Sequence, residues 1–258
     1  MENPIQSIWK RRSLVLAFAV MDLKLRYRNS SLGFLWSIAE PLLMLSVLYL
    51  VFTNIFKTEI ENYALYLLLG IVLWFFFNRA TSMSLTSIIG RGNIFTKIYF
   101  PREFPPLSSC LTAFFMTVFE LGVFFLFMIP LQFIPSITVF WLPILLIFEF
   151  IFILGFALPL SVVNARFRDV QYIWAVILQA GFFLMPIIYE LKIFPQAIQD
   201  ILSYIPMVSI LVMARDVVLY DTNPTIEGLG YLIISSVLFL LAGYAIFKKY
   251  ESHVVEEL

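Results

Sequence analysis

Residues 90–106, GRGNIFTKIYFPREFPP, separate two long apolar runs in a chain of 258 residues. This stretch is polar, basic and rich in proline, whereas its neighbours on either side are almost entirely apolar. Charged side chains are costly inside a bilayer, so a membrane protein keeps such a segment in water. We therefore expect residues 90–106 to form an aqueous loop that a second protein can bind, and the chain to be one part of a larger machine.

The composition of the whole chain is that of an integral membrane protein. Hydrophobic residues make up 61% of it and charged residues 13%, and the mean hydropathy is +0.93. A soluble domain is about half apolar and about a quarter charged. The formal net charge is zero, so the charge gives no indication of binding to nucleic acid. The single Cys110 excludes an internal disulfide, and the single His253 cannot form a histidine cluster.

Six apolar stretches are long enough to cross a bilayer, which takes about 20 residues. They lie at roughly residues 33–56, 63–88, 107–130, 137–162, 171–189 and 228–248. None shows the alternation that is typical of the strands of a membrane barrel, so we expect six transmembrane helices. The sequence therefore predicts an all-α integral membrane protein in which residues 1–258 form a single transmembrane domain.

Lysine and arginine are distributed unequally between the two sides that these spans define. Thirteen lie on the side of both termini, against three on the other side: Lys57, Lys192 and Arg215. Membrane proteins keep an excess of Lys and Arg in their cytoplasmic loops. This predicts that both termini and the loop 90–106 face the cytoplasm.

Two further apolar segments are too short or too polar to be spans. Residues 7–28 place Leu14, Phe18, Met21 and Leu25 on one helical face, which predicts an amphipathic helix in the cytoplasmic interface. The alternative is a poorly ordered leader. Residues 191–220 are interrupted by prolines and predict a re-entrant pair of short helices before the last span. The alternative there is one tilted extra span, which would place the C-terminus outside.

Four ionisable side chains fall within the predicted spans, at Glu40, Arg79, Glu120 and Glu149. They either pair with polar or charged neighbours on other helices and hold the bundle together, or they line a polar path. The residues leave both interpretations open, with pairing favoured.

Motifs of nucleotide, metal or acyl chemistry are absent from the sequence. It contains no G-x-x-x-x-G-K-[ST] phosphate loop, no H-E-x-x-H, no G-x-S-x-G and no Cys/His constellation. We therefore expect no catalytic residues, no metal site and no cofactor on this chain, so it is not expected to be an enzyme. Energy for any transport would come from an ion gradient or from a partner that hydrolyses a nucleotide.

Three segments resemble the membrane subunits of ABC-2-type exporters, in particular the branch that exports O-antigen, capsule and teichoic-acid chains. The first carries Asp22, Arg26, Tyr27, Ser30, Leu32, Gly33, Trp36 and Pro41. The second carries Asn93, Lys97, Phe100, Pro101, Arg102 and Glu103, and the third carries Arg168, Asp169, Pro186, Ile187, Ile188 and Tyr189. The resemblance covers nearly the whole chain, and among these exporters the chain is most similar to the O-antigen permeases. Ile205-Pro206 departs from the Asn-Pro of many relatives, which leaves the details of the external gate open.

The resemblance implies one half of a transporter. Two copies of the chain would form a channel above two copies of a separate ABC ATPase, which would carry ATP and Mg²⁺. The exporter would move a lipid-linked polysaccharide across a bacterial inner membrane. Residues 90–106 would hold a coupling helix that docks on the ATPase through Asn93, Lys97, Pro101, Arg102 and Glu103. The 191–220 hairpin would close the channel on the outside.

Aromatic and basic side chains supply candidate contacts for such a substrate. Aromatic rings offer flat apolar faces to sugars, and the candidates for lining the channel are Trp36, Tyr49, Phe52, Tyr172, Trp174, Phe182 and Phe183. With 28 Phe in the chain, the alternative is that such rings face lipid or fill helix contacts. Candidates for the lipid phosphates are Arg26, Arg28 and Arg91, for which ordinary contact with anionic lipid is the alternative.

Two other classes of function remain open from the sequence. One is an ABC-2 exporter of a small hydrophobic drug or lipid. The other is an ion-coupled carrier, for which only Glu120 and Glu149 would serve as coupling acids, or a membrane-embedded enzyme that modifies glycans. Dependence of transport on ATP and on a second polypeptide separates the first class from the second.

Overall fold

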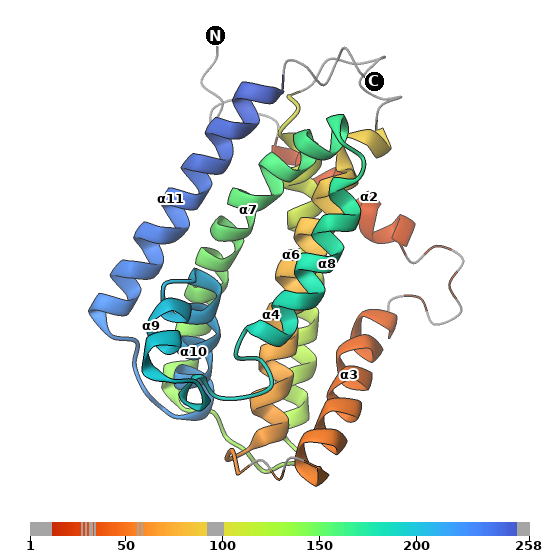
Figure 1. The fold of residues 1–258 in the computed structure, drawn as a ribbon. Helices are drawn as coiled ribbons and strands as arrows, with labels where there is room; N and C mark the ends of the chain where they lie inside the picture. Colours follow the sequence, from red (N-terminus) through yellow and green to blue (C-terminus); the bar gives the residue numbers. More distant parts are fainter. Residues whose placement is uncertain are drawn as a thin grey trace.

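The computed structural model describes residues 12–26, 28, 30, 33, 35–55, 57, 59–91 and 101–251, and this described part consists of helices and their connections, without strands (Figure 1). The N-terminal half contains α2 (Arg12–Arg26), α3 (Leu35–Asn54), α4 (Tyr63–Ser87), η1 (Ile89–Arg91) and α6 (Phe104–Met128). The C-terminal half contains η2 (Ile137–Trp141), α7 (Leu142–Arg166), α8 (Val170–Leu184), η3 (Leu191–Ile193), α9 (Gln196–Ser203), α10 (Pro206–Leu219) and α11 (Ile226–Tyr250). The predicted all-α membrane architecture is confirmed.

Five helices of the described residues are long and apolar enough to cross a membrane: α3, α4, α6, α7 together with η2, and α11. They coincide with five of the six predicted spans. The remaining predicted span, 171–189, is helical only as α8, whose 15 residues measure about 22 Å. Pro186 explains this early end, because the residue before a proline is pushed out of the helical region, and Met185 has an extended backbone (ψ 148°).

Helix α4 forms the centre of the bundle, with α3, α6, α7, α8 and α10 packed around it. Its residues 63–77 are apolar on all sides, and most of the helix is buried. A helix that is hydrophobic all round belongs in the interior of a bundle. Helix α11 lies at the edge of the bundle in Figure 1, where it packs along α7.

The bundle has two chemically different ends. We call one the basic end: it holds the beginning of α6 and the ends of α7 and α11, with Arg102, Arg166 and Lys248. We call the other the acidic end: it holds the α3–α4 connection and the segment after α8, with Glu59, Glu61 and Glu190. By the distribution of Lys and Arg, the basic end is the predicted cytoplasmic side.

Helices α9 and α10 form a bent pair, with an angle of 98° between them. Pro206 is the first residue of α10, a position that suits a residue without an amide hydrogen. Glu190, before the pair, and Tyr220, after it, line the same cavity at the acidic end. The segment therefore leaves and returns at one end of the bundle, as expected for the predicted re-entrant hairpin.

Helix α2 lies within the predicted interfacial segment 7–28 and packs on the first half of α6. Val15 and Ala19 are buried there, and the hydroxyl of Thr112 donates to the main-chain oxygen of Ala19 at 3.2 Å. A neighbouring face exposes Leu16 and Val20. A helix with one face on protein and an apolar face exposed suits the membrane interface, and its placement there stays a prediction.

Candidate functional site

The basic end contains the described part of the predicted coupling loop, residues 101–106. Glu103 is buried, and its Oε1 lies 2.6 Å from Nζ of Lys248, near the end of α11. Lys248 also lies 2.8 Å from the carboxylate of Glu251, and the guanidinium of Arg102 donates to the main-chain oxygen of Glu251. The start of α6 is thereby fastened to the end of α11. Asn93 and Lys97 lie outside the described residues.

Lys248 is a member of this contact that sequence reasoning missed. Its only signal in the sequence is its place in the last turn of an apolar helix, where cations complement the helix dipole. Pro101 is half-buried, and Pro105 and Pro106 stand in the first turn of α6, as expected for prolines that begin a helix. The loop thus ends in a fixed helix start rather than in a free linker.

A groove in the apolar part of the bundle runs between α3, α4 and α8. Its volume is about 400 Å³. It is lined by Met44, Trp74, Phe75, Asn78, Ser82, Ala175, Leu178, Gln179, Phe182 and Phe183. The groove therefore combines aromatic rings with amide and hydroxyl groups, which suits a ligand that has both apolar faces and hydroxyls. Two of the predicted channel aromatics, Phe182 and Phe183, lie here, and two from α4 were missed.

The other predicted channel aromatics separate into distinct environments. Trp36, Tyr49 and Tyr172 are exposed on α3 and α8, where they are available to a partner, a substrate or lipid. Trp174 is half-buried and its indole nitrogen donates to the hydroxyl of Thr81 at 3.1 Å, so packing between helices holds it. Phe52 lies apart from them, at the acidic end.

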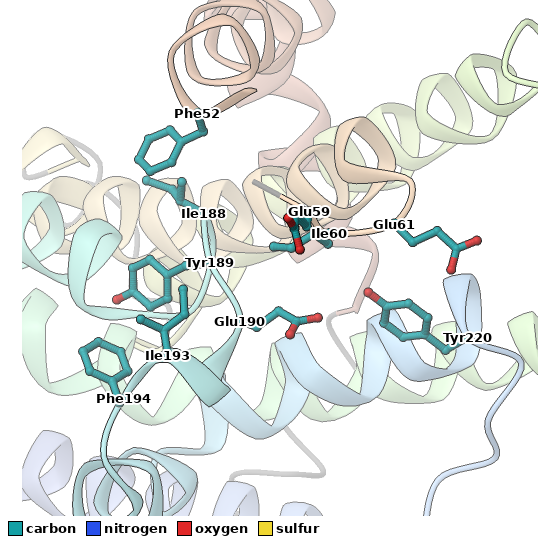
Figure 2. A pocket seen from close by; sticks show the side chains of 10 residues that line it. All are labelled: Phe52, Glu59, Ile60, Glu61, Ile188, Tyr189, Glu190, Ile193, Phe194 and Tyr220. Atoms are coloured by element: carbon teal, nitrogen blue, oxygen red, sulfur yellow. The ribbon is translucent and has the colours of Figure 1, made fainter. Parts of the chain in front are cut away.

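A larger cavity, of about 740 Å³, opens at the acidic end (Figure 2). Its lining comes from the end of α3, the α3–α4 connection, the segment after α8 and the end of α10. The residues are Phe52, Glu59, Ile60, Glu61, Ile188, Tyr189, Glu190, Ile193, Phe194 and Tyr220. Its volume falls within the range of about 300–1,000 Å³ that small-molecule sites occupy.

The two sides of this cavity differ in chemistry, as Figure 2 shows. Phe52, Tyr189 and Phe194 lie on one side with Ile188 and Ile193, and the rings of Tyr189 and Phe194 meet edge to face at 5.3 Å. Glu190 and Tyr220 lie on the other side, where Glu61 also lies. The cavity is thus amphipathic, with aromatic faces opposite carboxylates.

A buried arginine fixes the backbone behind this cavity. Arg215 of α10 donates to the main-chain oxygens of Pro186 at 2.5 Å and Ile187 at 2.9 Å, and to the hydroxyl of Tyr66 at 2.8 Å. Its guanidinium also stacks on the ring of Tyr66, 3.5 Å from the centroid. These contacts join the re-entrant hairpin to α4 and to the non-helical segment that follows α8.

Buried ionisable groups also occur in the middle of the bundle. Arg79 and Glu120 form a two-pronged ion pair between α4 and α6, with distances of 2.5 and 2.6 Å. The predicted pairing across helices is therefore confirmed for these two. Glu149 of α7 is fully buried, and neither carboxylate oxygen has a hydrogen-bond partner among the described residues. Glu40 is exposed on α3.

The candidate phosphate ligands lie near the basic end. Arg26, the last residue of α2, and Arg28 are exposed, whereas the side chain of Arg91 lies outside the described part. Their role in binding phosphate stays a prediction. Over the described ranges, no group of three or more His, Cys, Asp or Glu side chains is placed to hold a metal ion.

Comparison with known proteins shows which family has a similar sequence. A family model described as ABC-2 type transporter matches residues 13–219. An O-antigen export system permease protein, RfbA, of Klebsiella pneumoniae is 31% identical, over 95% of each chain. RfbA of Myxococcus xanthus is 28% identical over 98% of each chain, and the polysialic acid transport protein KpsM of Escherichia coli is 24% identical over 92% of this chain and 93% of KpsM.

Proposed function

Because this chain belongs to the ABC-2 type transporter family, we propose that it is the transmembrane subunit of an ATP-driven polysaccharide exporter. The cargo is a lipid-linked, O-antigen-like polymer, and the membrane is the bacterial inner membrane. The observation that carries the proposal is similarity to O-antigen permeases over 95% or more of both chains. Similarity on that scale includes the bundle, the hairpin and the basic end together.

The aromatic surfaces of the chain support a glycan as the cargo. Sugar rings present apolar C–H faces and a rim of hydroxyls, so flat rings next to amides bind them weakly at many points. The groove between α3, α4 and α8 has this composition, with Trp74 and Phe182 beside Asn78 and Gln179. A long polymer needs such a series of weak sites if it is to slide.

A second copy of the chain would complete the channel. Exposed apolar residues follow one another on α3 and α8, the two helices that border the aromatic groove. Those exposed by more than half are Leu35, Leu43, Val47, Leu50, Tyr172, Ile173, Val176, Phe183 and Leu184. Apolar area of this extent faces either lipid or a partner. We assign the faces beside the groove to the partner copy, with the polymer between the two chains.

We assign the ATP hydrolysis that drives export to two copies of a separate ABC ATPase, which would dock at the basic end. The sequence has no phosphate-binding loop of its own. The loop 90–106 is the proposed docking element, and both termini are proposed to be cytoplasmic, as the excess of Lys and Arg at that end predicts. ATP and Mg²⁺ would then be bound by the partner and not by this chain.

Depletion of the protein in its host tests this function. Polymer is assayed on the cell surface and in the cytoplasmic fraction after depletion. We expect surface polysaccharide to fall while lipid-linked polymer accumulates inside, since synthesis continues without an exit. Unchanged surface glycan would reject a polysaccharide cargo and favour an ABC-2 exporter of a small hydrophobic drug or lipid.

A further inference from the structure

The cavity at the acidic end has the size and the two-sided surface of a sugar subsite (Figure 2). Four aromatic rings line it, from Phe52, Tyr189, Phe194 and Tyr220. Two of the four are tyrosines, which offer a ring face and a hydroxyl to the same ligand. A sugar ring that stacks on the aromatic side keeps its rim of hydroxyls free for polar groups of the cavity.

The opposite side holds carboxylates, which accept hydrogen bonds and carry negative charge, beside the hydroxyl of Tyr220. Glu59, Glu61 and Glu190 line the cavity, and none of the described lining residues is basic. Ionised carboxylates accept hydrogen bonds from sugar hydroxyls, and they repel any anion that approaches within a few ångströms. The polar side therefore accepts a neutral sugar and opposes a uronic or sialic acid.

Three cations lie near the cavity, and none of them lines it. Lys57 is exposed on the α3–α4 connection. Lys192 has 85% of its side chain exposed and lies 4.0 Å from Glu190, so water screens that pair strongly. Arg215 borders Glu190 in an adjoining cavity, but its guanidinium is buried against main-chain oxygens. An acidic sugar in the cavity would therefore be lined by the carboxylates and by none of these cations.

We propose that this cavity is an exit-side subsite for uncharged sugar residues, and that its carboxylates select against acidic polymers. The inference rests on the proposed function and narrows its substrate class. Glu59 and Glu61 are exposed and Glu190 is half-buried, so water screens their repulsion as well. We take it as about tenfold weaker binding of an acidic sugar at low ionic strength, and salt reduces it further.

A matched pair of probes tests the selection. One is a neutral trisaccharide, and the other is the same trisaccharide with its primary hydroxymethyl groups oxidised to carboxylates. Both are titrated against the full chain with its ATPase partner in lipid nanodiscs, by saturation transfer from aromatic protons. We expect the ratio of the two dissociation constants to be about tenfold at low salt and to shrink as salt is added.

Variants show whether the cavity causes this ratio. Glu59→Gln, Glu61→Gln and Glu190→Gln combined should bring the ratio close to one, because the amides keep size and hydrogen bonding without charge. Glu227→Gln, which removes an exposed carboxylate at the start of α11, should leave it as in the wild type. Equal binding of both probes, binding of neither, or a ratio that survives the triple change would each overturn the subsite.

Chemical analysis of the polymer that accumulates on depletion separates this inference from the proposed function. A neutral repeat supports both. An acidic repeat that accumulates in the cytoplasm would overturn the selection and leave polysaccharide export standing. Unchanged surface glycan would reject polysaccharide export, whereas the probe titration would still decide whether the cavity binds uncharged sugars.

Discussion

The carboxylate of Glu103 lies 2.6 Å from the ammonium group of Lys248, and this contact joins the start of α6 to the end of α11. Glu103 lies in the proposed coupling loop and directly precedes α6, whereas Lys248 stands near the end of α11. At its other end α11 follows the re-entrant hairpin. A movement of the loop would therefore be transmitted to α11 and, through α11, to the acidic end.

Reversing one charge of this pair should uncouple the transporter. In Glu103→Lys, two ammonium groups face each other in a largely buried place, and in Lys248→Glu a cluster of carboxylates forms with Glu251. We expect each single variant to lose most surface polymer. The exchange of both charges, Glu103→Lys with Lys248→Glu, should restore a substantial part of it.

The measurement combines surface polymer with ATP hydrolysis by the purified complex. Lys249→Glu is the matched control, because it reverses the neighbouring exposed cation on the same helix. Normal export in both single variants would remove the ion pair from the coupling path. Loss of export without any rescue by the exchange would assign Glu103 to the ATPase interface instead.

Arg215 should be needed for a tight seal at the acidic end. Arg215→Met leaves the main-chain oxygens of Pro186 and Ile187 without this donor, at a cost of about 1–3 kcal/mol for each. Arg215→Lys should also fail, since an ammonium group lacks the planar fork that reaches both oxygens. We expect cells with either variant to admit a bulky hydrophilic dye.

A substitution that leaves Arg215 itself intact tests the same contact. A methyl group on Gly70 would lie 2.6 Å from Nη2 of Arg215, so Gly70→Ala should displace the guanidinium and also raise dye uptake. Lys192→Met, at an exposed site of the same end, serves as control. Dye exclusion as in the wild type in Arg215→Met and Gly70→Ala would refute a sealing role.

For the stability of the folded protein, loss of one partner of the Arg79–Glu120 ion pair should be more harmful than loss of both. Removing one partner leaves a buried charge alone, which costs about 3–5 kcal/mol. Arg79→Met and Glu120→Met alone should each shorten the lifetime of the folded protein in detergent on heating. The double variant should recover most of that lifetime, because an apolar pair avoids the desolvation of both charges. A double variant as short-lived as the singles would speak against this account.

The long helices were predictable because their apolar runs are interrupted by charged and proline-rich segments. Hydropathy alone did not show that Pro186 ends α8 at Leu184, which shortens the predicted fifth span. The charge distribution also marked the two ends of the bundle correctly as chemically different. These features depend on composition and on local backbone rules, which a sequence displays directly.

The contacts between distant residues were not predictable in the same way. Glu103 looked like a residue for a partner protein, and its pairing with Lys248 depends on how α6 and α11 meet. Trp174 looked like a channel residue, but its indole donates to Thr81. Hydropathy does not separate an aromatic ring in a helix contact from one that lines a groove, because both are simply apolar.

The proposed phosphate contacts at the basic end yield a prediction on export. Arg28→Ala combined with Arg91→Ala removes two cations that are candidates for a lipid diphosphate, so surface polymer should fall while the ATPase still copurifies. Lys249→Ala is a control for the general charge of this end. Unchanged surface polymer in the double variant would leave these arginines as ordinary contacts to anionic lipid.

The close packing of α7 and α11 depends on two glycines that face each other. A methyl group on Gly243 would overlap the main-chain oxygen of Gly155, and one on Gly155 would lie 2.7 Å from the main chain of Phe239. Without water to drive helices together in lipid, close approach at small residues supplies much of their association. Gly243→Ala should therefore push α11 outward.

Displacement of α11 should carry Lys248 away from Glu103, because Gly243 and Lys248 both belong to α11. We expect Gly243→Ala to lower both heat stability in detergent and surface polymer. Gly230→Ala provides a matched control on α11, because open space surrounds that position and alanine favours a helix by about 1 kcal/mol. If Gly243→Ala exported normally while α11 was displaced, the helix would not transmit movement from the basic end.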